Sequence, residues 1–114
     1  MITASLIVDE KDRSLSLEVK GHAGQAEIGK DIICASASIL LYTVAQEVMD
    51  MTRKGEVLSV TNINEGDSTV SCKCKTEEAY SEAIRVFYFG MVGYQLLAHN
   101  YPQFVEYKIV GEVE

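Results

Sequence analysis

The stretch Asp31–Lys54, DIICASASILLYTVAQEVMDMTRK, decides the fold class because it predicts one long helix. Apolar residues recur in it at spacings of three and four, so they share one face that is expected to point into a core. Asp31 is the expected N-cap, since its carboxylate can accept hydrogen bonds from the free N–H groups of the first turn. Gly55 is a suitable stop. The apolar face consists of Ile33, Ala37, Leu40, Leu41, Val44, Val48 and Met51.

Short strand-like runs lie on both sides of this helix. Leu15, Leu17 and Val19 alternate with polar residues, which is the period of a half-buried strand. The segment Asn64–Asp67 is a turn signal between two later runs. The expected strands cover residues 2–8, 14–20, 57–63, 68–75 and 104–110.

A second helix is expected from Thr76, a suitable cap, to about Asn100, and the only proline, Pro102, lies just beyond it. The resulting order, ββα-ββα-β, predicts an α+β fold: one mixed, mostly antiparallel sheet with two long helices packed on it. No linker or low-complexity segment interrupts the chain. Residues 1–114 are therefore expected to form a single domain.

The net charge and the composition limit which classes of molecule this protein is expected to bind. The formal net charge is −7, and a field of that sign repels phosphate backbones and anionic lipid. We therefore expect no direct nucleic-acid partner, and a basic protein or peptide is a more natural one. No run of about 18 apolar residues is present, so no membrane span is expected. The three cysteines are an odd number and no signal peptide is visible, which favours a reducing cytoplasm.

The stretch Gly21–Ser38, GHAGQAEIGKDIICASAS, is the one that could carry chemistry. If Asp31 is the N-cap, Cys34 is the third helical residue, close to free N–H groups and to the positive end of the helix dipole. Both favour thiolate over thiol, and a nearby protonated imidazole favours it further. His22 as general base and Cys34 as nucleophile would form a Cys–His pair.

Each residue also has a plainer interpretation. A lone cysteine is most often a small apolar residue that packs a helix, and His22 on its own is a polar loop residue after a strand. Taken together, four features favour the Cys–His interpretation. They are a histidine beside a glycine, a glycine-rich loop, an acidic residue and a helix-start cysteine.

The same stretch resembles the signature of the ribosomal-processing cysteine protease family, Prp, of Firmicutes and related bacteria. The family pattern is a Gly-His dipeptide, a Gly-rich loop, Gly-x-Asp-x-x-Cys-Ala, and a Ser four residues after the Cys. The resemblance implies a His22/Cys34 dyad, no cofactor, and a homodimer. It also implies a cysteine endopeptidase that removes the N-terminal extension of a large-subunit ribosomal protein, cutting after a Phe-Phe pair. The matching residues are Gly21, His22, Gly24, Gly29, Asp31, Cys34, Ala35 and Ser38.

The loop from His22 to Lys30 is predicted to be mobile and to close over bound peptide, because glycines give it freedom and apolar residues such as Ala23 and Ile28 suit a lid. Asp31 either caps the helix, which we prefer, or orients His22. Ser38 lies one turn after Cys34 and either bonds near the site or faces solvent. The residues expected to bind substrate or support the site are Gly21, Ala23, Gly24, Ile28, Gly29, Asp31 and Ser38.

Two other functions stay open at this point. One is a non-catalytic acidic dimer that binds a ribosomal or ribosome-assembly protein. The other is a thiol redox enzyme that uses Cys34. Cys72 and Cys74 are expected to pack in the core, since a metal site needs two more ligands, and His99 is expected to be structural. Gly90 and Gly93 weaken the second helix unless another element approaches closely, for example a second subunit.

Overall fold

The computed structural model describes residues 1–23 and 28–111, with side chains from residue 32 onward in the second range. The element order is the predicted ββα-ββα-β, and the predicted strand boundaries agree with the observed ones to within one residue. The elements are β1 (Ile2–Asp9), β2 (Ser14–Gly21), α1 (Ile28–Arg53), β3 (Val57–Asn64), β4 (Asp67–Cys74), α2 (Glu77–Asn100) and β5 (Val105–Val110).

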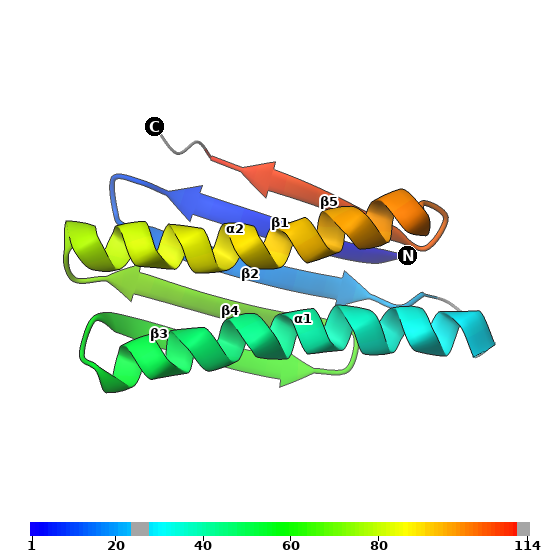
Figure 1. Ribbon diagram of the computed structural model, residues 1–114, viewed down its shortest axis with the longest axis horizontal. Helices are drawn as coiled ribbons and strands as arrows, with labels where there is room; N and C mark the ends of the chain where they lie inside the picture. Colours follow the sequence, from blue (N-terminus) through cyan, green and yellow to red (C-terminus); the bar gives the residue numbers. More distant parts are fainter. Residues whose placement is uncertain (24–27, 112–114) are drawn as a thin grey trace.

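The five strands form one sheet in the order β3-β4-β2-β1-β5. Neighbouring strands are antiparallel except β1 and β5, which run parallel. Both helices lie side by side over one face of this sheet, α1 above β3 and β4 and α2 nearer to β5 (Figure 1). The predicted α+β fold with a mixed, mostly antiparallel sheet is therefore confirmed.

The core lies between the sheet and the two helices. Alternate residues of the central strands point to the helices, so Leu6 of β1 and Leu17 of β2 are fully buried. From above, α1 contributes Val48 and α2 contributes Phe87, both also fully buried. Cys72 and Cys74 belong to this core, as the sequence predicted.

Gly90 and Gly93 mark the place where α2 meets α1. A Cβ atom at Gly90 would lie 2.5 Å from Cγ2 of Val44, and one at Gly93 would lie 2.3 Å from Cδ2 of Leu40. The absence of side chains lets the helices approach closely, which compensates for the low helix propensity of glycine. The close neighbour of both glycines is α1 of the same chain.

Local signals set three of the helix ends as predicted. Gly55 has φ +78°, and the N–H groups of Gly55 and Glu56 donate to the carbonyls of Thr52 and Met51, which is a Schellman motif. At the start of α2, Oγ1 of Thr76 accepts a 3.1 Å hydrogen bond from the amide of Ala79. The helix ends at Asn100, two residues before Pro102.

The prediction that Asp31 begins the first helix is wrong. The helix α1 begins at Ile28, so Asp31 lies inside its first turn and is not the N-cap. Counted from Ile28, Cys34 is the seventh helical residue instead of the third. The error has a physical reason: a carboxylate is favoured both at the N-cap and within the first turn, where it interacts with the helix dipole. The segment Ile28–Lys30, predicted as loop, is therefore helical.

The segment Ile32–Arg53 of α1 is long and apolar enough, by length and composition alone, to cross a membrane. The expectation of no such segment was based on an uninterrupted apolar run and was too strict. In this fold the inner face of the segment is used for packing, since Ile33, Val44 and Val48 are buried against the sheet and α2.

Candidate active site

His22 and Cys34 line one pocket of about 340 Å³. Three parts of the fold surround it: the N-terminal half of α1, the end of β2, and the turn between β3 and β4. The sequence separates the two residues by a glycine-rich stretch, and the tertiary structure brings them to the same cavity.

Cys34 is a free, half-buried thiol on the face of α1 that turns toward the pocket. Ser38 and Tyr42 follow at intervals of four residues and line the same pocket, because residues four apart share one face of a helix. Ser38 lines the pocket and is also exposed to solvent, so the choice between its two predicted roles stays open. Tyr42 is 54% exposed and brings an aromatic ring to the pocket about two helical turns after Cys34.

His22 follows the last residue of β2, and its backbone is held from two sides. The amide of Gly21 donates a 2.9 Å hydrogen bond to the carbonyl of Gly66, and the amino group of Met1 donates to the carbonyl of His22. Gly21 has φ +93°, and a Cβ atom there would overlap the carbonyl oxygen of Met1. Only glycine fits this position without displacing β1, so Gly21 determines where the chain turns toward His22.

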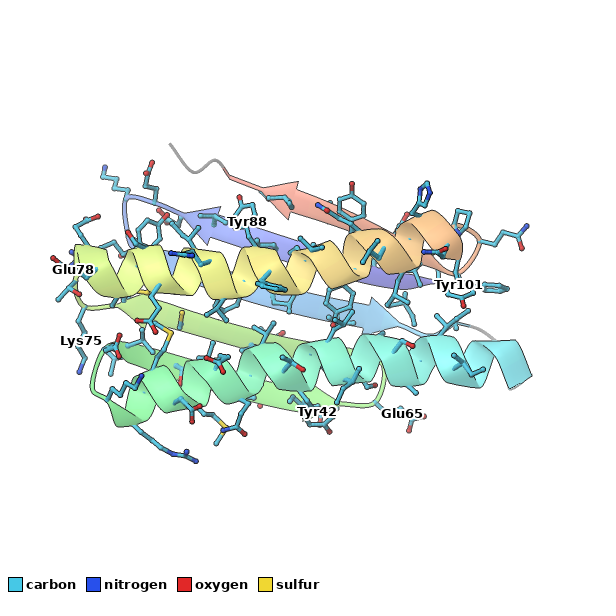
Figure 2. The ribbon with its side chains drawn as sticks, in the orientation of Figure 1. Tyr42, Glu65, Lys75, Glu78, Tyr88 and Tyr101 are labelled. Atoms are coloured by element: carbon cyan, nitrogen blue, oxygen red, sulfur yellow. The ribbon has the colours of Figure 1, made fainter. Side chains whose placement is uncertain are left out.

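The remaining walls contain both apolar and polar residues. Figure 2 shows Tyr42 of α1 and Glu65 of the β3–β4 turn at the same edge of α1, and both line the pocket. Glu65 is exposed and brings a carboxylate to the rim. The apolar wall residues are Ile2, Val19, Ala37, Leu41 and Ile63, and the other polar ones are Asn64 and Ser68.

The helix start does not contribute to the thiol site in the way that the sequence suggested. The free N–H groups of α1 belong to its first turn, and Cys34 lies about one turn further along, roughly 5 Å. Stabilisation of a thiolate, or of an oxyanion, by those N–H groups is therefore not supported by this geometry. Asp31 has a helical backbone one turn before Cys34, and its side chain lies outside the described residues.

The other predicted supporting residues fall into three groups. Gly21 and Ser38 line the pocket. Ala23 is buried in the hydrophobic core, so its apolar side chain has a packing role. Gly24 lies outside the described residues. Ile28 and Gly29 have a helical backbone, and the position of the Ile28 side chain lies outside the description. The predicted lid over residues 22–30 therefore stays a prediction.

Most residues that line the pocket were not predicted as site residues, among them Tyr42, Glu65 and Gly66. The spacing Cys34–Ser38–Tyr42 was a usable signal for the first. The segment containing Glu65 and Gly66 was identified only as a turn, because no local pattern shows that it lies beside a histidine more than forty residues earlier.

Cys72 and Cys74 lie elsewhere in the fold. Ser68 of β4 lines the pocket, and Cys72 is four residues further along that strand, roughly 13 Å away. Burial raises the pKa of Cys72 to about 12 and also raises the pKa of Cys74. Among the residues that the structure describes, no group of three or more His, Cys, Asp or Glu is placed to hold a metal ion.

Comparison with known proteins identifies relatives of the whole fold. The family model described as "Cysteine protease Prp" matches residues 1–106. The ribosomal processing cysteine protease Prp of Staphylococcus aureus is 33% identical over 52 residues, a stretch that spans 46% of this chain and 49% of that relative.

Two solved structures share the fold over nearly their full length. One is the S. aureus ribosomal processing protease Prp in complex with a covalently linked product peptide, with a TM-score of 0.72, 21% identity, and coverage of 96% of this chain and 99% of that one. The other is SMU.848 from Streptococcus mutans, with a TM-score of 0.71, 27% identity, and coverage of 98% and 96%.

Proposed function

Because this chain belongs to the cysteine protease Prp family, we propose that it is an endopeptidase in which His22 and Cys34 cleave a peptide bond by acyl transfer. The observation that carries the proposal is that these two side chains, with Ser38 and Tyr42, line a single open pocket. A thiol and an imidazole are the two groups that a Cys–His hydrolase requires.

The reaction follows from the groups in the pocket. The Cys34 sulfur attacks the scissile carbonyl carbon, and its proton passes to the His22 imidazole. When the tetrahedral intermediate collapses, the C–N bond breaks, His22 protonates the leaving amine, and a thioester to Cys34 is left. Water then attacks the thioester with His22 as base, which releases the carboxylate and restores the thiol.

The substrate is the N-terminal extension of a large-subunit ribosomal protein, cut after a Phe-Phe pair. Two features of the pocket support this assignment. Its lining includes several apolar residues and Tyr42 adds an aromatic ring, which suits aromatic side chains. Its rim carries Glu65, and the whole chain has a net charge of −7, which favours encounter with a basic protein. The three free thiols suit a reducing cytoplasm, where ribosomal proteins are made.

The protein acts as a homodimer through the outer surface of its helix pair. A second groove of about 540 Å³ lies between α1 and α2 on that surface, lined mainly by apolar side chains. Phe89 projects beside it with 79% of its surface exposed, and Val92 and Leu96 continue the apolar strip along α2. A projecting ring next to an apolar groove is self-complementary under two-fold symmetry. Sedimentation should show a dimer that Phe89→Ser weakens.

The positions of the other two cysteines disfavour a redox function. A thiol oxidoreductase needs a resolving cysteine near Cys34. Cys72 and Cys74 are buried, and they lie roughly 13 and 20 Å along β4 from Ser68 at the pocket wall. The thiol at the pocket is thus arranged for attack on a substrate.

A peptide-cleavage assay tests the proposed protease function. The protein is incubated with a peptide that carries a Phe-Phe-Ala junction, and the products are identified by mass spectrometry. We expect one cut, after the second Phe, and none with Cys34→Ala. A peptide bound by the protein but never cut would instead support the non-catalytic binding function.

A further inference from the structure

The turn between β3 and β4 is in direct contact with the catalytic histidine. A Cβ atom on Gly66 would lie 2.4 Å from Nε2, 2.7 Å from Cε1 and 3.2 Å from Cδ2 of His22. The space that any side chain at position 66 would occupy is therefore already filled by the imidazole. The ring rests against the bare backbone of the turn.

The backbone of the same turn also holds the chain just before His22. The carbonyl oxygen of Gly66 accepts the 2.9 Å hydrogen bond from the amide of Gly21. Gly66 thus contacts the histidine segment twice, once through its carbonyl at residue 21 and once through its Cα beneath the ring. This contact exists because β4 pairs with β2 and brings the turn beside the end of β2, with Asp67 opposite Lys20.

We infer that Gly66 is a positioning residue for His22. Its missing side chain lets the β3–β4 turn support the imidazole from behind and hold the ring in the pocket that contains Cys34. The inference rests on the proposed role of His22 as the base. It goes beyond that role, since it explains why a residue more than forty positions away must be glycine.

A turn glycine is also required for a reason unrelated to His22, and the chain supplies a control for it. Gly66 has φ +74° and Gly55 has φ +78°, so both positions are strained for any other residue except, to a lesser degree, Asn. A Cβ atom at Gly55 would meet nothing within 4 Å. Gly55 also lies at the opposite end of α1, roughly 30 Å along the helix from Cys34. Substitutions at Gly55 therefore reproduce the backbone strain without contact with the imidazole.

The test compares Gly66→Ala with Gly55→Ala, and Gly66→Asn with Gly55→Asn as a less strained pair that keeps the clash. The rate of Cys34 alkylation by iodoacetamide is measured between pH 5 and 9, with peptide mapping to separate Cys34 from Cys72 and Cys74. We expect both positions to lower the urea midpoint of unfolding by similar amounts. Only the Gly66 variants should slow Cys34 alkylation at neutral pH, by about tenfold or more, and move its pH profile toward that of His22→Ala.

A second measurement is independent of the protease function. The chain has two histidines, so the imidazole signals of His22 and His99 are resolved by NMR once His99→Gln assigns them. The His22 signal should move in the Gly66 variants and stay in place in the Gly55 variants.

If His22→Ala changes the alkylation profile and the Gly66 variants match wild type, the inference about Gly66 is wrong and the proposed dyad stands. If His22→Ala itself leaves the profile unchanged, the proposed dyad is wrong. The NMR comparison then decides alone whether Gly66 seats the ring.

Discussion

The hydroxyl of Tyr94, on α2, donates a 2.8 Å hydrogen bond to the carbonyl oxygen of Ala37, on α1. Tyr94 is fully buried, and Ala37 lies three residues after Cys34 and lines the same pocket. This bond joins α1, the helix that carries Cys34, to α2 at the level of the pocket. It also satisfies a phenolic hydroxyl that would otherwise be buried without a partner.

Tyr94→Phe should destabilise the fold by about 1 kcal/mol, because it removes this hydrogen bond while it keeps the ring. Urea denaturation measures the change. Tyr107→Phe is the control: its side chain is 44% exposed on β5, and surface substitutions usually change stability by less than about 0.5 kcal/mol. Equal midpoints for the two variants would show that the bond contributes nothing.

Cys34→Ala should abolish peptide cleavage and leave the fold intact, since a half-buried helical position accepts a small residue. Cys34→Ser should also be nearly inactive, because a hydroxyl ionises far less readily than a thiol. Product formation is followed by mass spectrometry, with circular dichroism to confirm folding. Substantial turnover by either variant would remove Cys34 from the mechanism.

His22→Ala should lose most activity and move the pH profile of Cys34 alkylation to higher pH, since an adjacent positive charge favours the thiolate. Alkylation rates of wild type and variant are compared from pH 5 to 9. His99→Ala is the matched control, because His99 is exposed in the last turn of α2. Superimposable curves for wild type and His22→Ala would mean that the imidazole does not act on the thiol.

Tyr42→Ala should lower kcat/KM for a substrate with aromatic residues at the cleavage site by roughly fivefold, the effect of losing an aromatic contact of about 1 kcal/mol. Tyr42→Phe keeps the ring and should stay near wild type. The measurement is the ratio of kcat/KM for a Phe-Phe peptide to that for a Leu-Leu peptide. An unchanged ratio in Tyr42→Ala would place the aromatic side chains of the substrate elsewhere.

The fold should lose stability as the pH rises above about 9. Burial raises the pKa of Cys72 to about 12 from a reference value of 9.0, so between these values the unfolded chain releases a proton that the native chain keeps. The native state binds more protons, and the free energy of unfolding therefore falls with rising pH in this window. Below pH 9 the contribution is fully present. Urea midpoints from pH 8 to 10.5 measure the slope.

Cys72→Val isolates this contribution, because it keeps an apolar side chain of similar size without a titrating proton. We expect its slope above pH 9 to be smaller than that of wild type. Part of the slope should persist, since burial also raises the pKa of Tyr94. Identical slopes for the two proteins would show that Cys72 has no part in the alkaline loss.

Local patterns were sufficient to predict the elements of this fold. Period-two alternation predicted β2, spacings of three and four predicted the buried face of α1, and Thr76 and Gly55 set helix ends through hydrogen bonds to neighbouring residues. Such signals depend on residues close in the chain, and so a single sequence displays them. The motif from Gly21 to Ser38 also indicated the family, which the family match over residues 1–106 confirms.

The tertiary structure decided where the site is and what surrounds it. The start of α1 at Ile28 was not predictable, because Asp31 suits both a cap and a first turn. The contact of Gly66 with His22 arises from the pairing of β4 with β2, and the position of Glu65 beside Tyr42 arises from the packing of α1 over β3 and β4. Sheet order depends on the burial of all five strands together, and so no short stretch of the sequence contains it.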